Sequence, residues 1–280
     1  MGCIKRFLKR TPIIRECVRV YIRRKKSVGI YKGKLKLARA WSFKRTEFSN
    51  YYYDITIRNR KDLAFTVAHV TSVPLSKIES YFCEVENNRE FKDALQAFRE
   101  DHYEMKDSTM EIARRIGWYA FVRAIKPRLV VETGVHHGVG ALTICAALER
   151  NHEEGFKGRY IGVDINPESG TLLKKPFNNF GEVIIGDSLD CLKNITTKIN
   201  LFINDSDHSE EYEAKEYAII ESKLGQNAII LGDNSHASDA LRLFSEEHTR
   251  DFLFFKEEPL DHFYSGAGIG ISFRSTNKNL

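Results

Sequence analysis

The 280-residue sequence contains no apolar run near the roughly 20 residues that a membrane-spanning helix needs. Its N-terminus is charged throughout and lacks the apolar stretch of a signal peptide. The cysteines are scattered, without CxxC spacing, at Cys3, Cys17, Cys83, Cys145 and Cys191. These absences argue against a disulfide framework and a cysteine zinc site, and they predict a cytoplasmic protein in a reducing compartment.

The sequence also lacks internal repeats and low-complexity segments. Its hydrophobic fraction of 42% and charged fraction of 29% are ordinary for a globular protein. A chain of this length can form one sizeable core with an additional subdomain.

Charge is distributed very unevenly. Residues 1–46 contain sixteen lysines and arginines and a single acid, Glu16, for a local net charge of +15. Since the whole chain carries +5, the remainder carries about −10. Pro12 is expected to begin the second of two short helices in this segment. The apolar residues that recur there at roughly helical spacing are Ile4, Phe7, Leu8, Ile13, Ile14, Val18, Tyr21 and Ile22.

A basic amphipathic segment of this kind can have three roles. It can lie on an anionic membrane surface, which we expect first and which would place the protein at the inner membrane face. It can instead dock its apolar side on the rest of the chain, or bind nucleic acid or an acidic protein.

The most informative motif is an apolar strand that ends in Glu132 and leads into a glycine-rich turn with Gly134 and Gly138. A helical pattern follows over 141–148. Strand, turn and helix in this order bring the backbone close to a nucleotide-like ligand. The spacing is E-x-G-x-x-x-G and not the G-x-G-x-x-G of dinucleotide-binding proteins, so we expect a ligand that carries an amino acid or sugar instead of a pyrophosphate.

Four further apolar strands end in polar residues, over 159–164, 183–188, 201–208 and 228–234. Open α/β sheets bind ligands at the carboxyl edge of their strands. The set predicts an α/β fold with a doubly wound, mostly parallel sheet. Asp164, at the tip of the second strand, is placed to bind ribose hydroxyls.

The tips of the fourth and fifth strands offer oxygen ligands. Asp205, Asp233 and Asn234 would supply two carboxylates and one amide, which suit Mg²⁺ or another hard divalent cation. Such a cation would lower the pKa of an acceptor hydroxyl. His208, three residues after Asp205, is a candidate general base. The plainer alternatives are that these acids cap the following helices and that His208 is a structural hydrogen-bond donor.

On these motifs, residues 107–274 resemble the class I S-adenosylmethionine (SAM)-dependent methyltransferases. The segment looks like the metal-dependent O-methyltransferases of sugars and small natural products, a group that includes macrolide-sugar and cephalosporin-tailoring enzymes. The resemblance implies a Rossmann-like sheet of seven strands with the last one antiparallel. It implies catalytic roles for Asp205 and His208 and metal binding by Asp205, Asp233 and Asn234. It implies cofactor contacts from Glu132, Gly134, Gly138, Asp164, Asp187 and Ser188.

Two positions depart from the family pattern. Gly140 stands where many relatives have serine, and Asn204 stands where an apolar residue is usual.

The flanking segments complete the expected organisation. We expect a basic N-terminal helical extension over 1–46, a helical cap that shapes the acceptor pocket over 47–106, and the catalytic domain over 107–280. Helices are predicted over 60–71, 76–83 and 90–99, and over 109–125 with Ser108 as its cap. The last two strands are predicted over 252–256 and 268–273.

The expected function is SAM-dependent, metal-assisted methylation of a hydroxyl on a sugar, a glycan or a similar polyhydroxylated acceptor. The alternatives are a nucleic-acid methyltransferase and a non-catalytic binding module. Base-amino methylation usually needs Asn/Asp-Pro-Pro-Tyr after the fourth strand, where this chain has Asp205-Ser206-Asp207-His208. Nucleic acid is therefore not the expected partner, and a homo-oligomer stays open.

Overall fold

The computed structural model describes residues 12–44, 53–101, 112–233 and 235–275. The chain forms two compact units: residues 1–45 with 261–264, and residues 46–260 with 265–280. Asn234 and the N-terminal residues Ile4, Phe7 and Leu8 lie outside the described residues.

The first unit is built on one long helix, α2 (Pro12–Ser42), which begins at Pro12 as predicted. The expectation of a short helix is wrong, because α2 continues for 31 residues. Proline suits a first helical position because its φ is already helical and its missing N–H needs no partner there. No residue of α2 is buried. The Lys34 ammonium donates to the backbone oxygens of His262 and Tyr264, at 3.1 and 2.8 Å.

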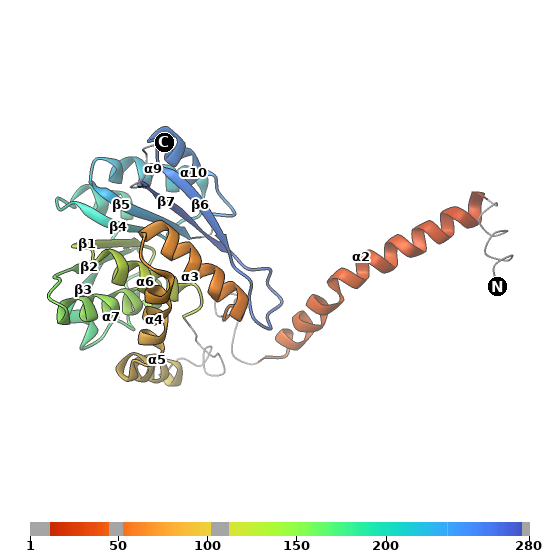
Figure 1. The fold of residues 1–280 in the computed structure, drawn as a ribbon, viewed down its shortest axis with the longest axis horizontal. Helices are drawn as coiled ribbons and strands as arrows, with labels where there is room; N and C mark the ends of the chain where they lie inside the picture. Colours follow the sequence, from red (N-terminus) through yellow and green to blue (C-terminus); the bar gives the residue numbers. More distant parts are fainter. Residues whose placement is uncertain (1–11, 45–52, 102–111, 234, 276–280) are drawn as a thin grey trace. The chain divides into compact units, whose positions relative to one another are not determined.

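The second unit is built on a seven-stranded sheet in the order β3-β2-β1-β4-β5-β7-β6 (Figure 1). β7 is antiparallel to both of its neighbours, and the other pairs are parallel. The strands are β1 (Leu129–Thr133), β2 (Arg159–Asp164), β3 (Gly181–Ile185), β4 (Ile199–Asn204), β5 (Leu224–Asp233), β6 (Asp251–Lys256) and β7 (Gly268–Phe273). The predicted doubly wound, Rossmann-like sheet is confirmed.

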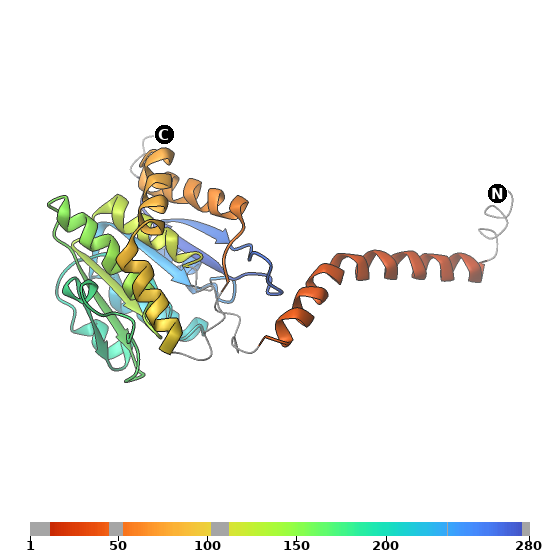
Figure 2. The same cartoon turned by 90° about the horizontal axis from the view of Figure 1, so that it is seen from below.

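Helices cover both faces of this sheet (Figures 1 and 2). One layer contains α3 (Ile57–Thr71), α4 (Leu75–Glu86), α5 (Arg89–Asp101), α6 (Arg115–Ile125) and α7 (Val139–Glu153). The other contains α8 (Ser188–Lys193), α9 (Glu210–Glu221) and α10 (Ala240–Glu247). A short 3₁₀ turn, η2 (Phe177–Asn179), packs against α7.

Burial on both faces explains why the central strands are almost wholly apolar. Every residue of β1 is buried. Val131 of β1, Phe202 of β4 and Ile230 of β5 pack together with Tyr217 of α9 and Phe244 of α10. Burial of such side chains contributes about 1.5–3 kcal/mol each.

The predicted helix over 109–125 is wrong at its start. The helix begins at Arg115, and residues 112–114 form a turn in which Ala113 has a left-handed φ of 41°. A residue in that conformation cannot continue a right-handed helix. Ser108, the expected cap, lies outside the described residues.

The helix predicted over 60–71 begins earlier, at Ile57, because Thr56 caps it: the Thr56 hydroxyl accepts the Asn59 N–H at 3.2 Å. The same region is tied to the sheet edge. Asn59 donates to the Lys256 backbone oxygen at 2.9 Å and accepts from the Glu258 N–H at 2.8 Å. These bonds hold the first turn of α3 beside the end of β6.

Within the ranges that the structure describes, no helix is both long and apolar enough to cross a membrane.

Candidate active site

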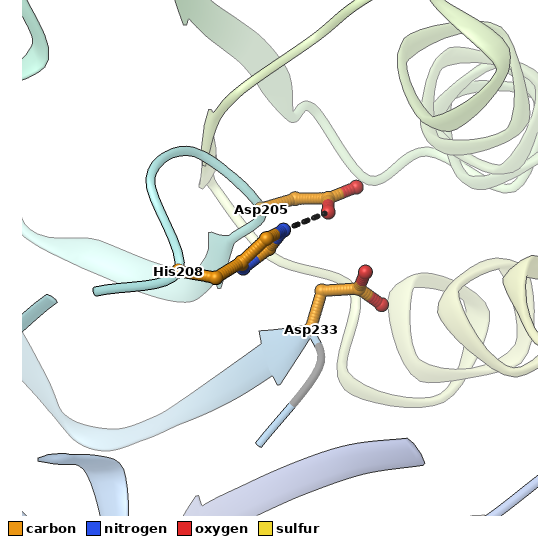
Figure 3. Close-up of side chains that lie close together, drawn as sticks. All are labelled: Asp205, His208 and Asp233. Carbon is orange, nitrogen blue, oxygen red and sulfur yellow. Dashed lines mark ion pairs between the residues drawn. The ribbon is translucent and has the colours of Figure 1, made fainter. Parts of the chain in front are cut away.

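Three side chains meet at the carboxyl ends of β4 and β5 (Figure 3). Asp205 follows β4 directly, Asp233 ends β5, and His208 lies in the loop between β4 and α9. One candidate ligand atom from each lies within 4.8 Å of the others. His208 Nε2 is 3.9 Å from Asp205 Oδ1. The structure therefore brings together Asp205, Asp233 and His208, and Asn234 lies outside the described residues.

Gly134 lets the glycine-rich loop approach this cluster. Its φ is 81°, and a Cβ at this position would lie 1.9 Å from the backbone oxygen of Asp205. The backbone N–H of Asp205 also donates to the Thr133 oxygen at 2.8 Å. Only glycine satisfies both the conformation and the contact.

The pKa values of the two aspartates shift in opposite directions. Burial raises the pKa of Asp205 well above its usual range, and the adjacent Asp233 adds to this effect. Burial acts in the same direction on Asp233, but the Arg114 guanidinium outweighs it and lowers the pKa of that carboxyl. Arg114 donates from Nε to Oδ1 at 2.5 Å and from Nη2 to Oδ2 at 2.7 Å. The pKa values of the two carboxyl groups are thus shifted in opposite directions, and a cation bound between them would favour the ionised form of both.

Arg114 has a second acidic partner, Glu257. Its Nε lies 3.2 Å from Glu257 Oε1, and the Tyr53 hydroxyl donates a short hydrogen bond to Glu257 Oε2. Arg114, Glu257, Tyr53 and Asp233 are all buried. Sequence reasoning missed this group because its members come from four separate segments and share no motif spacing.

Glu213, in the first turn of α9, lies next to the imidazole of His208. Its Oε1 lies 3.8 Å from His208 Nδ1, and Glu213 is buried. Interaction with Glu213 is the largest effect on the pKa of His208 and raises it, against the opposing effect of burial. A carboxylate on one ring nitrogen orients the other toward the site.

Glu216, one turn further along α9, links several strand tips. Its carboxylate accepts from the side chains of Ser188 and Asn204, from Ser206 Oγ at 2.9 Å and from Thr133 Oγ1 at 3.3 Å. Burial raises the pKa of Glu216 to about 7. This network explains the unusual Asn204: its amide is a donor to a buried carboxyl. Ser188 donates to the same carboxylate, and its expected contact with the cofactor stays a prediction.

Glu132 is buried beneath the start of α7. The Tyr160 hydroxyl donates a short hydrogen bond to it, and burial raises the pKa of Glu132 to about 7. A Cβ on Gly140 would lie 2.3 Å from Glu132 Oε1 and 2.7 Å from Trp118 Cζ3. The second departure from the family pattern thus has a packing reason, because the space of a serine side chain is taken.

Asp164 and Asp187 stabilise the loops at their strand tips. Asp164 Oδ2 accepts the N–H groups of Val135 and His136, both at 2.8 Å. Asp187 caps α8 by accepting the Leu189 N–H at 2.9 Å. Gly138, with a φ of 94°, precedes the first residue of α7. The cofactor contacts expected of these residues stay predictions.

Comparison with known proteins agrees with this architecture. Residues 131–235 match a family model described as a methyltransferase domain. These residues are similar to that domain, and the sheet that contains them has the seven-stranded, Rossmann-like methyltransferase fold. The matched residues run from β1 to the turn after β5 and include Glu132, Asp164, Asp205, His208 and Asp233. No curated protein matches the chain significantly.

Solved methyltransferase structures share this fold at low identity. The O-methyltransferase TomG from Streptomyces achromogenes, in complex with SAM, has a TM-score of 0.51 and 14% identity, and the match covers 68% of this chain and 91% of TomG. An O-methyltransferase from Bacillus cereus in complex with SAH gives 0.50 and 13%, covering 70% of this chain and 100% of that one. The SAH-bound methyltransferase PaMTH1 from Podospora anserina gives 0.50 and 17%, covering 71% and 94%.

Proposed function

We propose that this domain transfers the methyl group of SAM to a hydroxyl oxygen of a sugar, a glycan or a similar polyhydroxylated acceptor, assisted by Mg²⁺ or another hard divalent cation. The observation that carries the proposal is the convergence of Asp205, Asp233 and His208 beside the glycine-rich loop. The names of two similar structures support a hydroxyl acceptor, since TomG and the Bacillus cereus protein are described as O-methyltransferases.

The donor set fits a divalent cation. Mg²⁺ binds oxygen at 2.0–2.1 Å, so opposite ligands lie at most about 4.2 Å apart. One carboxylate oxygen of Asp205 and one of Asp233 lie within 4.8 Å of each other, so closing by a few tenths of an ångström would let both bind one cation. Arg114 occupies one lone pair on each Asp233 oxygen and leaves a second on each.

The electrostatics of the two aspartates also support a bound divalent cation. Burial and the adjacent Asp233 raise the pKa of Asp205, and a cation between the two carboxyl groups would offset both effects. A bound cation would lower the pKa of the acceptor hydroxyl and fix its oxygen toward the sulfonium methyl.

We assign the proton transfer to His208. Its Nδ1 faces the Glu213 carboxylate, so Nε2 is the nitrogen directed toward Asp205 and available to take the hydroxyl proton. Asp205 and Asp233 orient the acceptor oxygen. The methyl group then moves from sulfur to oxygen in line, and the protein contributes alignment and charge placement.

We further propose that α2 places the domain on an anionic membrane surface, where a lipid-linked or polymeric glycan would be the acceptor. Arg15, Arg19, Arg23 and Lys26 recur at the spacing of one helix face. The first half of α2 carries Ile14, Val18, Tyr21 and Ile22 between them. A basic stripe beside an apolar face is the pattern of an interfacial helix.

A calorimetric titration of the full chain with SAM in magnesium buffer tests the cofactor, and micromolar affinity is expected. Mn²⁺ binding, followed by electron paramagnetic resonance, tests the metal site. Asp205→Asn should weaken Mn²⁺ binding at least tenfold, because it removes a charged oxygen ligand. The matched control Asp207→Asn, two residues on and exposed, should not. Equal Mn²⁺ affinity in both variants would place any metal elsewhere.

The base role needs a transfer assay with methyl-labelled SAM and a panel of polyhydroxylated acceptors. His208→Ala should lower turnover strongly while SAM affinity persists. Loss of SAM binding in this variant would show that His208 belongs to the cofactor site instead.

A further inference from the structure

Arg115, the first residue of α6, is a cation with unused hydrogen-bonding capacity at the strand tips. Its Nε is buried and has no hydrogen-bond partner among the described residues. Its one ion pair in this part of the chain is with Asp205, and the 3.6 Å between Arg115 Nη2 and Asp205 Oδ2 is longer than a hydrogen bond. Its side chain keeps 18% of its surface exposed.

The position of this guanidinium is fixed. Its central carbon lies 5.2 Å from the ring centroid of Trp118, one turn further along α6. Trp118 is fully buried and packs beside Gly140 at the start of α7. The positive charge is close enough to Glu132 and Asp205 to act on the pKa of both carboxyl groups. Arg115 therefore lies between the tips of β1 and β4.

Arg114, the residue before Arg115, already has acidic partners. Arg114 is engaged by Asp233 through two hydrogen bonds and by Glu257 at 3.2 Å. Its positive charge is already compensated by these two acids. At the tips of β1 and β4, as far as the structure describes them, Arg115 is the cation left to meet an incoming anion.

We propose that Arg115 binds the carboxylate of the methionyl part of SAM. This inference rests on the proposed cofactor. The strand tips are rich in acids, with Glu132, Asp205 and Asp233, and would repel a carboxylate that arrived without a cation. A methionyl group carries an amino group and a carboxylate on the same carbon. An acid-rich edge suits the amino group, and the planar guanidinium of Arg115 suits the carboxylate.

The test compares two nucleosides, one with and one without the amino-acid part of the cofactor. S-adenosylhomocysteine carries both the amino group and the carboxylate, and methylthioadenosine lacks both. Wild type, Arg115→Met and Arg115→Lys are titrated calorimetrically with each. Arg115→Met should weaken S-adenosylhomocysteine binding about 10- to 100-fold, as expected for a lost charge-assisted contact, and leave methylthioadenosine binding unchanged within about threefold. Arg115→Lys should recover part of the difference.

The opposite results are equally clear. A parallel loss of affinity for both nucleosides would show a structural role for Arg115 and overturn the inference. Unchanged affinity for both would also overturn it, and would direct attention to an anionic group on the acceptor. If wild type binds neither nucleoside, the proposed cofactor fails and the inference falls with it. If every variant binds methylthioadenosine, the proposed cofactor site is present. A failure of the Arg115 inference can then be told apart from a failure of the proposed cofactor.

Discussion

Arg114 donates two parallel hydrogen bonds to Asp233, and both side chains are buried. The turn at 112–114, with Ala113 in the left-handed region, precedes α6 and presents Arg114 to the tip of β5. The same arginine touches Glu257, so one cation compensates two buried acids. Arg114 is therefore the main source of positive charge for Asp233, whereas Arg115 has the larger effect on Asp205.

Arg114→Gln should lower the free energy of unfolding by about 3–5 kcal/mol, because it leaves two buried carboxylates without their cation. Millimolar Mg²⁺ should restore part of the loss by supplying positive charge to Asp233. Urea denaturation with and without Mg²⁺ measures both effects. The control is Arg159→Gln, which breaks an exposed pair with Glu182 and should cost less than about 1 kcal/mol. Equal losses in the two variants would contradict the assigned role.

Gly140→Ala should destabilise the domain by about 1–3 kcal/mol, since the new methyl group would overlap Glu132 Oε1 and Trp118. It should also weaken SAM binding, because Glu132 and the start of α7 would have to move. Thermal unfolding and calorimetry measure the two changes. Gly225→Ala is the matched control in β5, where the nearest atoms to a Cβ are 3.3 Å away. A Gly140→Ala protein as stable as the control would show that the side chains of Glu132 and Trp118 move aside freely.

Stability should depend on pH through Glu216. Its pKa in the folded protein is about 7, raised by burial from 4.5, so the folded state binds the proton more tightly than the unfolded state does. Stability is therefore highest below about pH 4.5 with respect to this group and falls as pH rises to about 7, by about 3 kcal/mol in total. Glu132 adds a loss in the same direction.

Glu216→Gln tests this dependence by urea denaturation at pH 5 and pH 8. The variant should be less stable than wild type at pH 5, because an amide has one oxygen where the carboxyl group accepts from four side chains. It should lose less stability than wild type between the two pH values. Glu182→Gln, at an exposed position, should keep the wild-type dependence. An unchanged pH dependence in Glu216→Gln would refute the assignment.

Replacing Arg15, Arg19, Arg23 and Lys26 together by glutamine should reduce binding to anionic vesicles. Each basic residue near such a surface contributes about 1 kcal/mol, so the loss should approach two to three orders of magnitude. Sedimentation with phosphatidylserine-containing vesicles measures it. A control with four exposed basic residues outside α2 neutralised, Arg58, Lys61, Lys77 and Arg89, should bind as wild type does. Equal binding by both variants would remove the membrane proposal.

The sequence by itself determined the sheet and the position of the ligand edge. The apolar runs of the central strands, the turn at Gly134 and the polar residues after each strand are local signals. Local signals survive in any context because strand burial and turn geometry act over a few residues. They were enough to predict that Asp205, Asp233 and His208 lie together, and the structure confirms this placement.

Only the tertiary structure decided which side chains surround those acids. Arg114 and Asp233 are 119 positions apart, and Tyr53 and Glu257 are 204 apart. No periodicity or motif connects such residues, because their proximity follows from strand order and from the path of the segments before α3 and α6. The same holds for Asn204 and Glu216, whose hydrogen bond turns an apparent departure from the family pattern into a structural requirement. Burial and neighbouring charges then shift the pKa of each acid, and both are properties of the packed fold.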